Sequence, residues 1–232
     1  MQARGEALRE ALAERILVLD GATGTWIQSQ NLSAADFGGD ELEGCNENLV
    51  LTRPDVVRAL HTAYFEAGAD MVETDTFGGT PLVLAEYGLQ DKAFEINRRA
   101  AELAREVAAG FSTPERPRFV AGSMGPTTRS VTVTGGVTFE DLIGHYRVQA
   151  AGLLAGGADV LLLETTQDTR NLKAGLIGIQ EAFSDTAKGS IYSASQLTPW
   201  RFVSSGGLWI GLAFAVTFLA ITVRMRRYRE PI

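Results

Sequence analysis

Polar residues whose types could hold a small ligand follow four short apolar runs of the sequence. Carboxylate oxygens accept hydrogen bonds, hydroxyls both donate and accept them, and glycine lets a ligand approach the backbone. These residues are Asp20-Gly21, Thr74-Asp75-Thr76, Gly125-Pro126-Thr127 and Glu164-Thr165. The same placement after four runs indicates one site to which several elements contribute.

The apolar runs before these residues are predicted to be buried parallel strands. Each run is nearly continuous in apolar residues and is bounded by glycine or an acidic residue, which is typical of strands covered on both faces. The runs span residues 16–21, 71–77, 119–125 and 160–165. Segments with helical periodicity separate them, so the sequence predicts βα units on a parallel sheet. Functional residues of such folds lie at the C-terminal ends of the strands.

Two of the separating segments carry signals for the start and the end of a helix. Pro54 suits the first turn of one helix, and Gly68 suits its C-terminal cap. Thr138 suits the N-cap of the other helix, and Gly156 and Gly157 follow its last turn. The sequences "EAGADMVET" and "AGGADVLLLET" follow the same plan, so the two units are predicted to repeat one structure.

Several polar residues also have structural interpretations. Gly21 and Gly24 could shape a tight turn. Asp75 and Glu164 could cap helices or form salt bridges.

Other candidate residues are interpreted as structural. Asp70 and Asp159, each after an alanine at the end of a predicted helix, are interpreted as turn residues. Cys45 has no base near it in the sequence, so a structural role is favoured over a nucleophile. His61 and His145 lie in predicted helices and are interpreted as surface or packing residues.

The charge of the chain is unevenly distributed. The net charge is −7, but residues 1–183 carry 15 basic and 26 acidic residues, whereas residues 184–232 carry six and two. An acidic body argues against nucleic acid as a partner, because phosphates need a basic surface. The chain has a single cysteine, which excludes an intramolecular disulfide and a site of several cysteines. No secretory signal is visible in the first twenty residues.

The strand ends and their flanks resemble one family over residues 6–183. They are similar to the N-terminal homocysteine-binding domain of cobalamin-dependent methionine synthase, more than to betaine-dependent homocysteine methyltransferases, which share the fold. The resemblance implies an α/β fold, namely four βα units that form the first half of a (β/α)8 TIM-type barrel. The segments that carry it are "ERILVLDGATGTWIQ", "GCNENLVLTRPDVVRALHTAYFEAGADMVETDTFGGT", "FVAGSMGPTTR" and "GGADVLLLETTQDTRNLKAGL".

The resemblance also implies a set of substrate-binding residues for homocysteine. Asp20, Gly21 and Ala22 match the loop that contacts the amino-acid end of homocysteine. Glu164 matches the acidic residue that helps to hold the amino group, and Thr76 is a further candidate at the end of the second strand.

The cofactors implied by the family are zinc and cobalamin. Zinc would hold the homocysteine sulfur as a thiolate, which attacks a methyl group carried on cobalamin. Separate cobalamin and folate modules of a full-length enzyme are the implied partners. The three zinc-binding cysteines of the family match no position here, so we expect no metal ligand and no catalytic residue in this chain. As written, it is expected to be inactive as a methyltransferase.

The C-terminal part has a different character. Residues 184–201 are predicted to be a linker, and residues 202–232 a single transmembrane helix with a basic tail. Residues 202–223 contain no charged residue and are long enough to cross a bilayer core of about 30 Å, although a buried helix of a soluble protein is the alternative. This ending resembles the last span of an ABC-2 type permease.

The basic tail creates a conflict of topology. The positive-inside rule would place the tail in the cytosol and the body outside, yet the body resembles a cytoplasmic enzyme. We therefore expect that two unrelated coding fragments are joined near residues 183–190. The enzyme-like body is expected to be cytoplasmic, and a membrane location is expected only if the tail is genuine.

Three functions remain open from the sequence. The favoured one is a truncated homocysteine S-methyltransferase domain of the methionine synthase type. The others are a membrane-anchored binding or assembly protein that uses a half-barrel, and a homocysteine methyltransferase with a methyl donor other than cobalamin.

Overall fold

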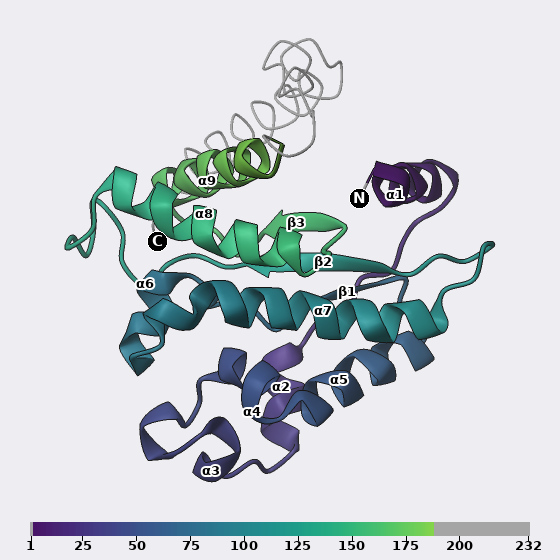
Figure 1. Ribbon diagram of the computed structural model, residues 1–232, viewed down its shortest axis with the longest axis horizontal. Coiled ribbons are helices and arrows are strands. Elements are labelled where there is room, and N and C mark those ends of the chain that lie inside the picture. Colours follow the sequence, from purple (N-terminus) through teal and green to yellow (C-terminus); the bar gives the residue numbers. More distant parts are fainter. Residues whose placement is uncertain (1, 188–232) are drawn as a thin grey trace, which may run out of the picture. The chain divides into compact units, whose positions relative to one another are not determined.

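A computed structural model of the protein describes residues 2–187 (Figure 1). Helices alternate with parallel strands along most of this range. The elements are α1 (Gln2–Glu14), α2 (Thr23–Ser29), α3 (Ala34–Phe37), α4 (Leu49–Thr52), α5 (Pro54–Glu66), β1 (Met71–Glu73), α6 (Pro81–Leu84), α7 (Ala93–Phe111), β2 (Phe119–Met124), α8 (Phe139–Ala155), β3 (Val160–Leu163) and α9 (Thr169–Ala187). Short 3-10 turns cover Asp40–Leu42, Asn46–Asn48, Ala85–Tyr87 and Gln90–Lys92.

Within residues 2–187, three strands form one parallel sheet in the order β1-β2-β3. Met71 pairs with Phe119, and Ala121 pairs with Val160. All six residues of β2 are buried, as expected for a central strand covered on both faces. The prediction of βα units on a parallel sheet is confirmed for these three strands, each of which ends before the predicted residue.

The first predicted strand, at residues 16–21, is wrong within the described residues. Only an isolated parallel bridge forms there, between Leu19 and Met71. The side chains of Ile16 and Val18 are 90% and 55% exposed. The apolar run suggested a strand buried on both sides, but among the described residues it has a strand neighbour on one side only.

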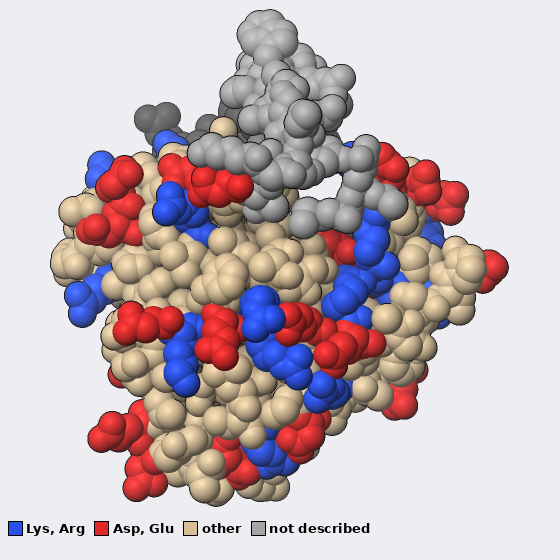
Figure 2. Space-filling view, in the orientation of Figure 1, with Lys and Arg blue, Asp and Glu red and all other residues tan. Residues whose placement is uncertain are grey.

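The long helices pack beside one another and against the sheet. Helices α5, α7, α8 and α9 lie side by side (Figure 1), α7 and α8 pack on β2, and α9 packs on β3. Apolar side chains of this layer, such as Tyr146 and Leu153, are fully buried against the strands. On the face shown in Figure 2, acidic and basic side chains are interspersed over α7, where Arg58 pairs with Glu106 at 2.7 Å.

The predicted helix ends are confirmed. Helix α5 begins at Pro54, and Thr138 caps α8 through a hydrogen bond from Asp141 N. Gly68 and Gly157 have φ angles of +103° and +90°, and both helices close with the same pair of backbone bonds. Those bonds form a Schellman motif, in which glycine is favoured because its φ is positive.

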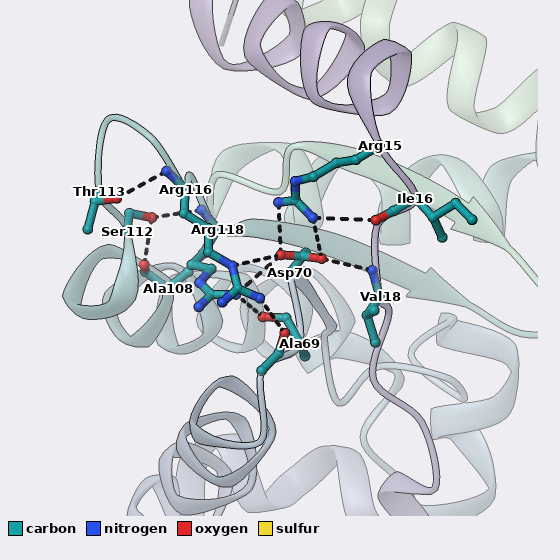
Figure 3. Close-up of polar contacts among 11 residues, drawn as sticks. Arg15, Ile16, Val18, Ala69, Asp70, Ala108, Ser112, Thr113, Arg116 and Arg118 are labelled. Atoms are coloured by element: carbon teal, nitrogen blue, oxygen red, sulfur yellow. Dashed lines mark hydrogen bonds and ion pairs between the residues drawn. The ribbon is translucent and has the colours of Figure 1, made fainter.

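Asp70 and Asp159 do more than terminate turns. The carboxylate of Asp70 is 1% exposed and receives hydrogen bonds from Val18 N at 3.0 Å and from the Arg15 guanidinium at 2.8 and 2.9 Å (Figure 3). Arg116 and Arg118 contact the same carboxylate at 3.3 Å. Asp70 therefore anchors the start of β1 to the preceding chain segment.

Asp159 repeats this arrangement one unit later. Its buried carboxylate accepts from Val120 N at 2.8 Å and pairs with Arg4 and Arg105. Arg4 lies on α1 and Arg15 directly follows that helix, so the two aspartates tie both ends of α1 to the N-terminal ends of the strands. The interpretation as turn residues missed these long-range ion pairs.

No helix among residues 2–187 is long and apolar enough to span a membrane. The predicted transmembrane helix at 202–223 lies outside the described residues, as does most of the predicted linker at 184–201. Helix α9 continues to Ala187, past the residue where the first domain was predicted to end.

Candidate functional site

A cavity of about 290 Å³ lies at the C-terminal ends of the strands. The loop before α2, the turn before α4 and the ends of all three strands contribute to its wall. The lining residues are Ala22, Thr23, Gly24, Asn46, Glu47, Glu73, Thr74, Asp75, Phe77, Ser123 and Glu164. The cavity is therefore placed where the alternation of strands and helices predicts a functional site.

Two of the predicted site residues, Ala22 and Glu164, line this cavity directly. Ala22 has a φ of +54°, a left-handed conformation that a residue with a side chain adopts only under strain. Thr165, next to Glu164, has a φ of +52°. Positive φ angles thus occur at one lining residue and directly next to another, and strained backbone of this kind is common at functional sites.

The other predicted residues support the cavity wall from behind. The Asp20 carboxylate accepts a hydrogen bond from Glu73 N at 2.8 Å, and the Gly21 carbonyl accepts one from the Tyr64 hydroxyl. Thr76 is fully buried, and its hydroxyl donates to the Ser123 carbonyl at 2.8 Å. These residues fix the ends of neighbouring strands, and none of them is among the lining residues.

Glu164 is oriented by the neighbouring strand. The Ser123 hydroxyl donates to Glu164 Oε1, and Glu164 N donates to the Met124 carbonyl at 3.2 Å. Ser123 lies in β2 and Glu164 directly follows β3, so the pairing of the two strands brings these side chains together. The carboxylate is held at the cavity wall with lone pairs available for a ligand.

The cavity is acidic. Among the described residues, four carboxyl groups line it and no basic side chain does. Burial, together with the charge of Glu164, raises the pKa of Glu73 to about 7. Burial also raises the pKa of Asp20 to about 7, and that of Asp75 well above its ordinary value, with a contribution from Glu47. Such an environment favours a ligand with a cationic group.

Sequence reasoning missed Glu47, Glu73 and Ser123. The polar residues considered at these two strand ends begin at Thr74 and Gly125. Glu73 lies one residue before Thr74, and Ser123 lies two residues before Gly125. Glu47 lies before α4, and its carboxylate reaches the cavity through a bond of 2.6 Å from Gly78 N. Side chains alternate between the two faces of a strand, and this alternation along β2 was the signal that could have identified Ser123. Nothing in the sequence spacing indicated the contact between Glu47 and Gly78.

The described residues do not fit the zinc site that the resemblance implies. The Cys45 side chain is fully buried, and burial raises the pKa of its thiol to about 12, which disfavours the thiolate that zinc binds. His61 is buried in α5, where burial lowers its pKa to about 4. Within residues 2–187 no group of three or more His, Cys, Asp or Glu side chains could hold a metal ion.

Comparison with protein families shows which family model matches the chain. Residues 17–213 match the homocysteine S-methyltransferase family, so the match continues past residue 183 and into the apolar run at 202–223. Nothing in the comparisons supports the resemblance of that run to a permease.

Curated relatives include two methionine synthases. The chain is 45% identical to that of Mycobacterium leprae over 181 residues and 44% identical to that of Mycobacterium tuberculosis over 177 residues. These alignments cover 78% and 76% of the chain, and the chain spans 15% of the length of each relative.

Solved structures of the homocysteine methyltransferase MmuM from Escherichia coli have a similar fold. The oxidized form aligns with a TM-score of 0.63 at 26% identity over 76% of this chain and 62% of its own. The metallated form aligns with a TM-score of 0.62 at the same identity. Because the family match covers more than half of the chain, the protein belongs to the homocysteine S-methyltransferase family.

Proposed function

We propose that this chain contributes the homocysteine-binding part of a methyltransferase domain of the methionine synthase type, which converts homocysteine to methionine. The relatives at 45% and 44% identity support this type over homocysteine methyltransferases that use another methyl donor. One structural observation carries the proposal. The Glu164 carboxylate, held by Ser123, lines an acidic cavity together with the strained loop at Ala22.

In the proposed binding mode, the ammonium group of homocysteine donates hydrogen bonds to Glu164. Charge-assisted bonds of this kind are stronger than neutral ones, and a cavity without basic side chains does not compete for the carboxylate. Ala22 of the loop Asp20–Ala22 lines the same cavity. Thr76 contributes through its bond to the Ser123 carbonyl, behind the cavity wall.

The residues of this chain bind and orient the substrate in this proposal. The relatives imply zinc and cobalamin in a full-length enzyme, where the two would activate the homocysteine sulfur and carry the methyl group. The described residues do not fit a zinc site. Cobalamin and folate modules are the partners that the proposal implies.

Isothermal titration calorimetry of the purified 232-residue chain with L-homocysteine tests the proposal. Wild type is compared with Glu164→Gln, which keeps the size of the side chain and removes its charge. Loss of a charge-assisted bond of about 1.5–3 kcal/mol predicts a rise of the Kd by roughly 10- to 150-fold. The matched control is Glu66→Gln, an exposed carboxylate at the end of α5, which should leave the Kd unchanged. Equal affinity of wild type and Glu164→Gln would remove Glu164 from the site.

A further inference from the structure

Gln149 connects two strand ends from behind the cavity. It lies on α8 and its side chain is fully buried. Its Nε2 donates to the Thr76 carbonyl at 2.7 Å and to the Ser123 carbonyl at 3.3 Å. One amide group therefore links the chain segment that leaves β1 to the strand β2.

The same contacts lead to Glu164. The Ser123 carbonyl also accepts from the Thr76 hydroxyl at 2.8 Å, and Ser123 N donates to the Thr74 hydroxyl at 3.0 Å. The backbone of Ser123 is thus held at its N–H and at its C=O. Because the Ser123 hydroxyl donates to Glu164, the position of this backbone sets the direction of the Glu164 carboxylate.

Stability alone does not account for a glutamine at this place. The Thr76 carbonyl already accepts from Gly79 N at 2.9 Å, and the Ser123 carbonyl has its bond from Thr76. Neither carbonyl would lose its last partner without Gln149. Gln149 Oε1, in contrast, is buried with no hydrogen-bond partner among the described residues, which is unfavourable. An apolar side chain of similar length would avoid this cost.

We propose that Gln149 is a positioning residue for the homocysteine site, which acts on Glu164 through Ser123. The inference rests on the proposed function, because the Gln149 amide is taken to orient Glu164 for its contact with homocysteine. It predicts that Gln149 affects the affinity for homocysteine although it does not line the cavity.

The first test is a double-mutant cycle in the purified 232-residue chain, with the Kd for L-homocysteine as the readout. Gln149→Met keeps the length of the side chain and removes both bonds. We expect the Kd to rise about tenfold in Gln149→Met. The variant Gln149→Met/Glu164→Gln should bind no more weakly than Glu164→Gln alone, because coupled residues act non-additively.

The control is Asn171→Leu, which removes a buried amide that bonds to Tyr146 and Thr127, none of which lines the cavity. It should lower the thermal midpoint and leave the Kd unchanged. A loss of affinity in Asn171→Leu equal to that in Gln149→Met would show a general structural effect and overturn the proposal.

The pH dependence of a conservative variant adds a second readout. The buried carboxyl group introduced by Gln149→Glu can donate a hydrogen bond only when it is protonated, and burial favours the protonated form. The ratio of the Kd of this variant to that of wild type should therefore fall between pH 8 and pH 6. A ratio that does not change with pH would contradict the donor role.

The outcomes separate the inference from the proposed function. If Glu164→Gln weakens binding and Gln149→Met does not, only the inference is wrong. If wild type does not bind L-homocysteine, the proposed function fails, and hydrogen exchange of the Ser123 amide decides the inference. Faster exchange in Gln149→Met than in Asn171→Leu would support the positioning of Ser123, and equal exchange would overturn it.

Discussion

Replacement of Asp70 by asparagine should destabilise the protein through the loss of one buried charge. The new amide side chain would keep an oxygen that can accept the hydrogen bond from Val18 N. It would lose the charge that pairs with Arg118, whose side chain is 8% exposed, and with Arg15 and Arg116, which are 39% and 48% exposed. The variant thus isolates the charge from the backbone bond (Figure 3).

The expected loss is at most about 2 kcal/mol of the free energy of unfolding, because the asparagine keeps the bond from Val18 N. The arginine partners and the Val18 amide lower the pKa of Asp70 from 3.8 to about 2, which corresponds to about 2 kcal/mol in favour of the folded, ionised form. The two half-exposed arginines contribute at most about 1 kcal/mol each of this. Because the folded pKa is lowered, the stabilisation is present above about pH 4 and is lost as the pH falls toward 2.

Urea unfolding at pH 7 and at pH 3 measures this effect. The matched control is Asp55→Asn on α5, whose side chain is 66% exposed and pairs with Arg53. Asp55→Asn should cost less than Asp70→Asn at pH 7, because exposed ion pairs contribute little. The difference between wild type and Asp70→Asn should shrink at pH 3. An equal cost for the two variants at pH 7 would refute the argument from burial.

Three further predictions concern packing, thiol reactivity and charge. Gly156→Ala should destabilise the protein by more than about 1 kcal/mol in urea unfolding, because the new Cβ would lie 2.2 Å from the Arg98 carbonyl oxygen. The control Gly144→Ala, whose Cβ would meet open space, should be neutral or stabilising. The Cys45 thiol should react with a disulfide reagent at pH 8 only after unfolding, and a reaction rate equal in native and unfolded protein would contradict its burial. Glu73→Gln should raise the thermal midpoint of the ligand-free chain more at pH 8 than at pH 5. The folded pKa of Glu73 is about 7, so its carboxyl group increasingly destabilises the folded state as the pH rises from about 4 to 7.

The sequence predicted the part of the fold that depends on local signals. The strand at residues 119–125 was found nearly to the residue, because β2 is covered on both faces and its sequence is nearly continuous in apolar residues. Pro54 and Thr138 located the helix starts for a similar reason, since a first turn and a cap depend on neighbouring residues. The run at 16–21 has the same local pattern, but a strand also needs neighbours, and the sequence does not show which are present.

The site was predictable only where it coincides with a strand end. Glu164 was indicated by its place directly after an apolar run, whereas Ala22 was identified only through the resemblance to the homocysteine-binding domain. Glu47 escaped because its place in the cavity depends on a contact with Gly78, 31 residues away along the chain. The arginine partners of Asp70 were missed for the same reason, since Arg15 and Arg116 are 55 and 46 residues distant in sequence.

The most direct test of the central claim is a structure of the chain with L-homocysteine bound. We predict that the amino nitrogen lies within hydrogen-bonding distance of the Glu164 carboxylate, in the cavity that Ala22 and Ser123 also line. A bound homocysteine outside this cavity, or one whose amino group faces away from Glu164, would contradict it.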